Sequence, residues 1–254
     1  MKPHPRNLFK ARLGKAQQIG FFATLGSPGL TELLAGTGFD WALVDTEHSP
    51  VEVPDVIEHL RAIEGAGIPA LVRPAWNDMV LIKRILDQGA QTLLIPYVET
   101  AEEARAAVSF TRFPPGGVRG VSGASRAANY GLTPGYFAAV EAEICVIVQI
   151  ETANALARIE EIASVDGVDA VFIGPSDLSA SMGHLGNPLH PEVQGAIDDG
   201  FRRLKAIGKP IGYLSGNEEE FRRRLGQGVD FISFATDAVI ARQAATSLLA
   251  RLKG

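Results

Sequence analysis

The sequence lacks the features that mark several large classes of protein. It contains one cysteine, Cys145, within the apolar run CVIVQI, so an intrachain disulfide is impossible and we expect a buried structural thiol. No segment approaches the roughly 18 apolar residues of a membrane-spanning helix, and residues 1–22 contain no apolar stretch of signal-peptide length. These absences predict a cytoplasmic protein without a membrane partner.

An excess of positive charge is also missing. The chain has 24 basic and 29 acidic residues, a net charge of -5, which leaves no surplus to neutralise a phosphate backbone. Nucleic acid is therefore excluded as an expected partner. The length of 254 residues with 46% hydrophobic residues instead fits one large domain with a substantial core.

Short β-rich runs alternate with longer segments of helical period along the whole chain. The pattern begins with IGFFATLG, LTELLAGTG, WALVDTEH and VPDVIEHLRAIEGAG, and it yields eight strand runs and eight helical runs. Glycines stand where helices should stop, at Gly38, Gly67, Gly89, Gly208 and Gly228. We predict a single α/β domain over residues 1–254, a (β/α)8 TIM barrel. The alternative, an open doubly wound sheet, would carry a glycine-rich turn after its first strand, and TLGSPGLT matches one poorly.

Two segments depart from this rhythm. The loop from about residue 114 to 134, PPGGVRGVSGASRAANYGLTP, is longer than an ordinary connection. Its glycines would suit a phosphate cradle, but no strand precedes them and no P-loop lysine follows, which favours a lid or a subunit contact. The apolar last helix, VIARQAATSLLARL, is able to pack on a neighbouring subunit as readily as on its own barrel.

Polar residues at the carboxyl ends of the predicted strands are the candidates for chemistry, because that face carries the active site of a barrel. Glu151 and Asp177 end the adjacent strands five and six, and neither has a basic residue beside it in its own segment. Two such carboxylates indicate a site for Mg²⁺, Mn²⁺ or a similar divalent ion. The alternative is a pair of solvated acids.

Two cationic or titratable side chains share this face. Arg73 ends the apolar run ALVR, where its charge would be costly without an anion, so it either stabilises substrate charge or pairs with Asp45 or Glu47. His48 is the only histidine at a strand end and is the candidate base, although a lone histidine is more often structural.

None of the seven lysines falls at a strand end, whereas an aldolase that acts through a Schiff base needs one there. If the chain is an aldolase, it should therefore depend on a metal. The turn GPSD before and at Asp177 has backbone N–H groups that would suit a substrate carboxylate.

Several ordered blocks, spread over nearly the whole chain, resemble one family. The blocks VDTEHSP, VRPAWND, LLIPYVET, RGVSGASRAANYG, VQIETANAL and IGPSDLSASMG are similar to the metal-dependent 4-hydroxy-2-oxoheptanedioate aldolases, the HpcH/HpaI family. Where that family commonly has GEH, this chain reads TEH, which leaves Glu47 and His48 intact. The resemblance implies reversible cleavage of 4-hydroxy-2-oxo acids, including 2-dehydro-3-deoxy sugar acids, to pyruvate and an aldehyde.

The resemblance also implies a role for each matching residue. It makes Glu151 and Asp177 ligands of a divalent metal ion, Mg²⁺, Mn²⁺ or Co²⁺. It makes His48 the general base and Arg73 the residue that stabilises the transition state. Contacts to the oxo acid are implied for three residues, namely Gln149, Ser176 and Asp177.

Two further matches concern the assembly, which the resemblance implies is a homo-oligomer, a hexamer. Arg126 matches a loop arginine at the subunit interface. Asp87 matches an aspartate that raises the basicity of the histidine, yet the end of a helix should place it at the opposite rim, so it would act from a neighbouring subunit. Asp45 is the local alternative partner for His48.

Two other functions remain open from the sequence. The same barrel chemistry would serve an acyl-CoA ester lyase or a β-oxo acid decarboxylase, although the modest basic content argues against CoA. A non-catalytic protein that binds oxo acids would need the pocket but not the base, so His48 counts against it.

Overall fold

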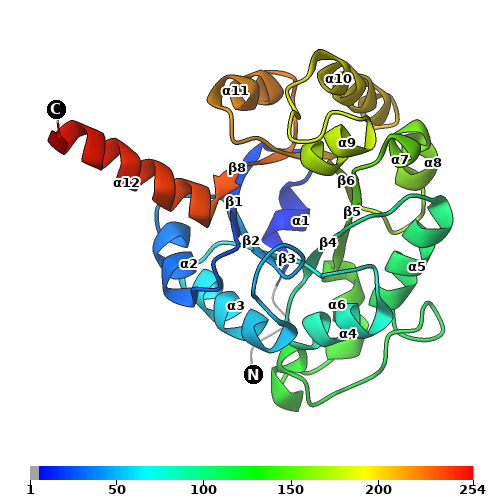
Figure 1. Ribbon diagram of the computed structural model, residues 1–254. Coiled ribbons are helices and arrows are strands. Elements are labelled where there is room, and N and C mark those ends of the chain that lie inside the picture. Colours follow the sequence, from blue (N-terminus) through cyan, green and yellow to red (C-terminus); the bar gives the residue numbers. More distant parts are fainter. Residues whose placement is uncertain (1–5, 254) are drawn as a thin grey trace.

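The strands close into a barrel in the computed structural model, which describes residues 6–253 and leaves out residues 1–5, with His4, and residue 254. Each strand pairs in parallel with the next, and β8 returns to β1 (Figure 1). The predicted TIM barrel is confirmed, and the open sheet is excluded. The strands are β1 (Gln18–Ala23), β2 (Trp41–Asp45), β3 (Ala70–Arg73), β4 (Thr92–Ile95), β5 (Cys145–Ile150), β6 (Ala170–Ile173), β7 (Ile211–Leu214) and β8 (Phe231–Thr236).

The helices surround the barrel, with more breaks than the sequence pattern predicts. The single helix expected after β5 divides at Arg158 into α7 and α8, and a short helix, α9, precedes the long one expected after β6. The helices are α1 (Leu8–Arg12), α2 (Pro28–Ala35), α3 (Val56–Gly65), α4 (Met79–Asp87), α5 (Ala101–Thr111), α6 (Tyr136–Glu143), α7 (Ala153–Ala157), α8 (Ile159–Ala163), α9 (Pro175–Ser181), α10 (Pro191–Ala206), α11 (Glu218–Gly226) and α12 (Asp237–Lys253), with 3-10 turns η1 (Val53–Asp55) and η2 (Arg126–Gly131).

Large aromatic side chains fill the barrel interior, and glycines on neighbouring strands make room for them. A Cβ atom on Gly20 would lie 2.1 Å from the ring of Trp41, and one on Gly212 would lie 2.2 Å from the ring of Phe231. Both aromatic residues are buried. Because the interior is packed in this way, only the ends of the barrel are open to a ligand.

Helix α1 closes the amino-terminal end of the barrel. It lies within the ring of strands in Figure 1, and Phe9 packs edge-on against Trp41 and Phe231 at the starts of β2 and β8. The side chain of Asn7 anchors this helix by donating to the backbone oxygen of Glu143 at 2.8 Å and to Thr92 Oγ1 at 2.9 Å. The carboxyl ends of the strands are left as the accessible face.

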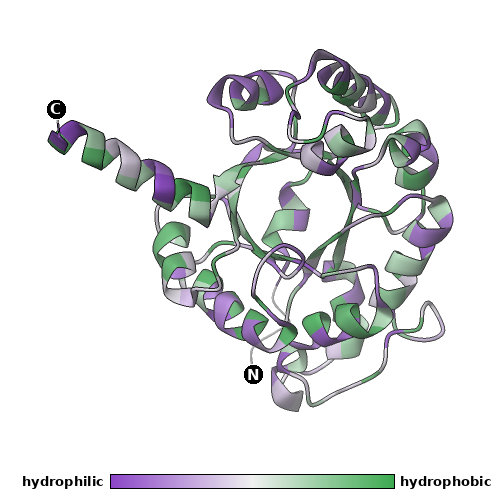
Figure 2. Cartoon of the chain, viewed as in Figure 1, coloured by the Kyte–Doolittle hydropathy of each residue, from purple (hydrophilic) through white to green (hydrophobic). Residues whose placement is uncertain are grey.

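Helix α12 points away from the barrel. Figure 1 shows it projecting as a separate arm, and Figure 2 shows hydrophobic and hydrophilic segments alternating along it. Leu248, Leu249 and Leu252 are at least half exposed. Across residues 6–253, no helix is both long enough and apolar enough to cross a membrane.

Candidate functional site

Side chains from β2, β3 and β5 meet at the carboxyl end of the barrel. Arg73 donates from Nε to Asp45 Oδ1 at 2.9 Å and from Nη2 to Asp45 Oδ2 at 2.7 Å. Both residues are buried. Burial opposes the charge of Arg73, but hydrogen bonding to Asp45 and the charges of Asp45, Glu47 and Glu151 outweigh it and raise its pKa. Arg73 is therefore a fixed cation whose third nitrogen, Nη1, remains for other contacts.

Glu47 lies between this cation and His48. Arg73 Nη1 lies 3.0 Å from Glu47 Oε2, yet this buried oxygen accepts no well-aligned hydrogen bond, so the contact is one of charge. Burial raises the pKa of Glu47 to about 7, with Asp45 and Asp177 adding to the rise and Arg73 opposing it. His48 Nε2 lies 3.8 Å from Glu47 Oε2, and its side chain is 63% exposed. His48 is thus an accessible imidazole at the edge of the charged group.

Glu151 is the buried carboxylate of the site. Its Oε1 accepts a hydrogen bond of 2.7 Å from the backbone N–H of Tyr97, and its Oε2 accepts one from Gln149 Nε2. Burial raises its pKa to about 7 against these two hydrogen bonds, and the charges of Glu47 and Asp177 raise it further. Tyr97 has a φ of 53°, so a left-handed backbone turns its N–H toward the carboxylate. A cation bound here would relieve a real electrostatic cost.

Helix α9 brings Asp177 to the same carboxyl end of the barrel, which we call the barrel mouth. Gly174 precedes the helix, Pro175 is its first residue, and Asp177 lies half-buried in its first turn while Ser176 is exposed. A Cβ atom on Gly174 would lie 2.9 Å from Glu151 Oε2. The turn GPSD therefore needs glycine because its backbone passes directly over Glu151, which brings the two acidic segments together.

The donor set at this mouth fits a hard divalent ion. Glu151 and Asp177 supply carboxylate oxygens, and the charges of Glu47 and Asp177 help to raise the pKa of Glu151, which indicates an excess of negative charge at this place. Magnesium commonly takes one or two carboxylates and keeps several waters, so two protein ligands suffice. Among residues 6–253, the one set of three potential metal ligands that converge within 4.8 Å lies elsewhere, at His184, His190 and Glu192.

Two predicted site residues lie at the opposite rim, where α3 and α4 end. Asp87 accepts a hydrogen bond of 3.0 Å from Arg119, which is buried. Arg126 donates to Gln88 O at 2.7 Å and to Glu64 Oε2 at 2.6 Å, beside a cavity of about 580 Å³. Within one chain the structure therefore does not join Asp87 to His48, and it does not join Arg126 to the strand-end acids.

Asp45 is not the partner of His48 that the sequence offered as an alternative to Asp87. It binds Arg73 and the backbone N–H of Glu47, at 3.0 Å, whereas the carboxylate near His48 is Glu47. The sequence offered Glu47 only as a possible ion-pair partner of Arg73, which it is, and gave Tyr97 and Gly174 no contact with Glu151. The position of Glu47 one residue before the candidate base was the available signal, whereas the other two contacts depend on the fold.

Comparison with known proteins identifies the family. The sequence model described as HpcH/HpaI aldolase/citrate lyase matches residues 18–244. The chain belongs to the HpcH/HpaI family. It is 52% identical to the hydroxypyruvate/pyruvate aldolase of Sagittula stellata, over 95% of this chain and 96% of that protein. It is 49% identical to the 4-hydroxy-2-oxo-heptane-1,7-dioate aldolase of Klebsiella pneumoniae, over 96% of this chain and 93% of that protein.

Solved structures of the HpcH/HpaI family agree with this assignment. A family member from Burkholderia cenocepacia is 38% identical and superposes with a TM-score of 0.94, over 98% of this chain and all of that one. The family expected from the sequence is confirmed, and so is the expectation of an aldolase, a carbon–carbon lyase. The relatives do not favour the CoA-ester lyase, decarboxylase or binding-protein alternatives.

Proposed function

We propose that the protein is a metal-dependent aldolase that cleaves 4-hydroxy-2-oxo acids reversibly to pyruvate and an aldehyde. The relatives from Sagittula and Klebsiella are named for this kind of chemistry. The observation that carries the proposal is the joining of an accessible base, His48, a fixed cation, Arg73, and the buried Glu151 at one barrel mouth. Because no lysine occurs at a strand end in the sequence, the electron sink is a metal ion and not a Schiff base.

Glu151 and Asp177 are the proposed ligands of that ion. Glu151 is held by the backbone of Tyr97 and by Gln149, so its carboxylate keeps one orientation. When bound, a divalent ion of the Mg²⁺, Mn²⁺ or Co²⁺ type polarises the 2-oxo group and stabilises the enolate. Ser176, exposed beside Asp177, and Gln149 are the proposed contacts of the oxo acid.

Arg73 is proposed to stabilise the charge that develops on the 2-oxo oxygen. Its Nε and Nη2 are committed to Asp45, so Nη1 is the nitrogen that turns toward the mouth, near Glu47 and 3.5 Å from Gln149 Oε1. A preorganised donor of this kind acts without rearrangement during the reaction. Catalysis and ion pairing, which the sequence presented as alternatives for Arg73, are thus compatible.

His48 is the proposed general base. In the cleavage direction His48 takes the proton of the C4 hydroxyl, and the C3–C4 bond then breaks. The electron pair of that bond passes to the pyruvate enolate, and C4 becomes the carbonyl carbon of the aldehyde. The enolate then takes a proton at C3, from water or from His48, to give pyruvate, and His48 returns to the neutral imidazole as its proton passes to C3 or to solvent. Glu47 lies 3.8 Å from His48 Nε2 and would stabilise the imidazolium between these steps.

The test is release of pyruvate from 4-hydroxy-2-oxoheptanedioate, followed with lactate dehydrogenase. Protein treated with a chelator should be inactive, and Mg²⁺, Mn²⁺ or Co²⁺ should restore release. Glu151→Gln should lose the metal-dependent rate, and His48→Asn should lower kcat by about 10²- to 10⁴-fold. Glu219→Gln, on an exposed glutamate of α11, is the matched control and should be fully active. Equal rates for wild-type protein and Glu151→Gln would refute the assignment.

A homo-oligomer, a hexamer, is part of the same proposal. The projecting helix α12, with Leu248, Leu249 and Leu252 exposed, supports a contact with a neighbouring subunit. Such an assembly is also the proposed route by which Asp87 and Arg126 serve a neighbour's site. Light scattering after size-exclusion chromatography measures the mass, and the double variant Leu248→Glu with Leu252→Glu should reduce it. A monomeric wild-type protein would remove Asp87 from the proposed mechanism.

A further inference from the structure

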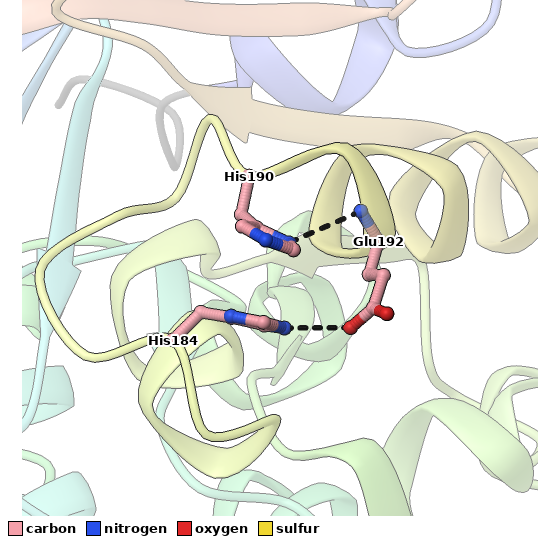
Figure 3. Close-up of side chains that lie close together, drawn as sticks. All are labelled: His184, His190 and Glu192. Carbon is pink, nitrogen blue, oxygen red and sulfur yellow. Dashed lines mark hydrogen bonds and ion pairs between the residues drawn. The ribbon is translucent and has the colours of Figure 1, made fainter.

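A second group of metal-binding side chains lies outside the barrel mouth, in the connection between α9 and α10. His184, His190 and Glu192 face one another there (Figure 3). Each offers one ligand atom, and the three atoms lie within 4.8 Å of one another. We propose that these side chains form an accessory site for a transition-metal dication such as Zn²⁺. This proposal does not depend on the aldolase reaction.

The ligand types favour a different class of ion from the one proposed at the mouth. Two imidazoles and one carboxylate are a common set for Zn²⁺, with water in the fourth position. Imidazole also suits Co²⁺, Ni²⁺ and Cu²⁺, whereas Mg²⁺ prefers oxygen ligands. The pair Glu151 and Asp177 offers oxygen alone. Mg²⁺ should therefore bind only at the mouth, whereas Co²⁺ suits both sites, so the test has to remove the ligands at the mouth.

The ligand atoms are close together, although the rings must rearrange to share an ion. His184 Nε2 lies 2.7 Å from Glu192 Oε2, and the rings of His184 and His190 stack with centroids 3.6 Å apart, so one ring has to rotate out of the stack before both imidazoles can bind the same ion. A tetrahedral ion with bonds of about 2.0–2.1 Å would widen the nitrogen–oxygen separation to roughly 3.3 Å and replace the proton that the pair shares. The Glu192 side chain is 71% exposed and has room to make this adjustment.

Glu192 is suited to be the anionic ligand. Its Oε2 lies 2.7 Å from His184 Nε2, so the carboxylate already faces the imidazole nitrogen with which it would share an ion. His190 Nδ1 accepts the backbone N–H of Glu192 at 3.3 Å, as the N-cap of α10. That hydrogen bond is long, so a metal ion would displace little stabilisation if it took this nitrogen.

The backbone holds the two histidines in place. His184 N donates to Ser179 O at 2.7 Å, Asn187 N donates to His184 O at 2.9 Å, and His190 N donates to Asn187 O at 3.0 Å. Gly183 has a φ of 84°, which permits the turn out of α9. Binding would therefore require little ordering of the loop, which favours affinity.

The position of the site gives it a structural consequence. His184 lies three residues after the end of α9, the helix that carries Ser176 and Asp177, and Glu192 lies in the first turn of α10. A metal ion at the cluster would fasten the end of α9 to the start of α10. The alternative is a surface His184–Glu192 ion pair beside a capping histidine, with no affinity for metal.

The test separates the two metal sites with variants. Tag-free protein carrying Glu151→Gln and Asp177→Asn, which removes the proposed ligands at the mouth, is treated with a chelator and titrated with Zn²⁺ by calorimetry and with Co²⁺ by visible absorption. We expect one bound ion per chain, with the absorption of tetrahedral Co²⁺. Adding His184→Gln to this background should weaken binding by at least about tenfold.

Further variants distinguish the loss of a metal ligand from the loss of folded structure. His190→Asn removes the imidazole but keeps a good N-cap, so it should lose the metal while the circular dichroism stays unchanged. Glu192→Gln should also weaken Zn²⁺ binding, and its control, Glu219→Gln in the first turn of α11, should bind Zn²⁺ normally. The proposal is overturned if the background protein binds no Zn²⁺, or if His184→Gln and His190→Asn bind it as tightly as the background does.

Discussion

Arg73 holds Asp45 through two parallel hydrogen bonds, at 2.9 and 2.7 Å, in the buried floor of the barrel mouth. These two hydrogen bonds fix the guanidinium and leave Nη1 as the only guanidinium nitrogen that does not bind Asp45. The ammonium group of a lysine has a single nitrogen, so it is unable to make both hydrogen bonds to Asp45 and also place a donor where Nη1 lies.

The first prediction follows from this pair. Arg73→Lys should fold, because the charge opposite Asp45 is kept, but kcat for pyruvate release should fall by about 10²- to 10³-fold. Arg73→Ala is the poorer test, because it leaves Asp45 buried without a positive charge beside it, at a cost of about 3–5 kcal/mol. Arg61→Lys, at an exposed pair with Glu58, is the control and should keep full activity. An Arg73→Lys enzyme with normal kcat would show that the guanidinium has no part in the reaction.

The second prediction concerns the glycine above Glu151. In Gly174→Ala the new methyl group would lie 2.9 Å from Glu151 Oε2 and 3.0 Å from Glu151 Cβ, so the carboxylate must move. Because displacement of a reacting group by about 1 Å can cost about 10²-fold, we expect a loss of that order in metal-dependent activity. Gly216→Ala adds a Cβ with no atom within 4 Å and should be neutral. The measurement is the rate of pyruvate release by both variants as the metal concentration is raised, compared with that of wild-type protein.

The third prediction is a pH dependence of stability in metal-free protein. Burial raises the pKa of Glu151 to about 7 from an ordinary 4.5, so between these values the folded state keeps a proton that the unfolded chain has released. The contribution of Glu151 to the free energy of unfolding therefore falls as pH rises through this window. Glu47, with a pKa of about 7, acts in the same direction.

Glu151→Gln removes one of these titrations. The midpoint of its thermal unfolding, measured relative to that of wild-type protein, should rise between pH 5 and pH 7. Added Mg²⁺ above pH 7 should stabilise the wild-type protein and not the variant, because binding to the folded state alone adds stability. Parallel midpoint curves for the two proteins across this range would contradict the raised pKa.

The fold was predictable because its signals are local. Alternating strand and helix periods, with glycines such as Gly38 and Gly89 at helix ends, specify a βα repeat without knowledge of tertiary contacts. The positions of Glu151 and Asp177 followed from the same repeat, since strand ends converge in a barrel. The break at Arg158 carries no comparable signal, because its φ of -108° is compatible with every residue type except proline.

The remaining parts of the site depend on contacts between distant segments. Tyr97 reaches Glu151, 54 positions away, through a backbone N–H whose direction is set by a left-handed turn. The convergence of His184 with Glu192 depends on the path of the loop between them. Asp87 likewise pairs with Arg119, 32 positions away, a contact that the local sequence pattern did not indicate.

The last prediction concerns the choice of aldehyde. The rings of Trp76 and Tyr97 stack at the mouth, with centroids 5.6 Å apart and planes 29° apart, and the residues are 54% and 37% exposed. Burial and the charges of Asp177 and Glu151 raise the pKa of the Tyr97 phenol, which places it beside the acidic residues. We therefore expect the pair to form an apolar wall for the part of the aldehyde that points away from Glu151 and Asp177, the proposed metal ligands.

Trp76→Ala tests this wall with less disturbance than a change at Tyr97, whose backbone holds Glu151. In the addition direction, with pyruvate as donor, the variant should lose about tenfold in kcat/KM for benzaldehyde or hexanal relative to glycolaldehyde, because an apolar contact of this size contributes about 1–3 kcal/mol. Trp76→Phe keeps a ring that is able to stack and should retain most of the preference. If Trp76→Ala lowered kcat/KM equally for all three aldehydes, the pair would support the fold of the mouth and not its specificity.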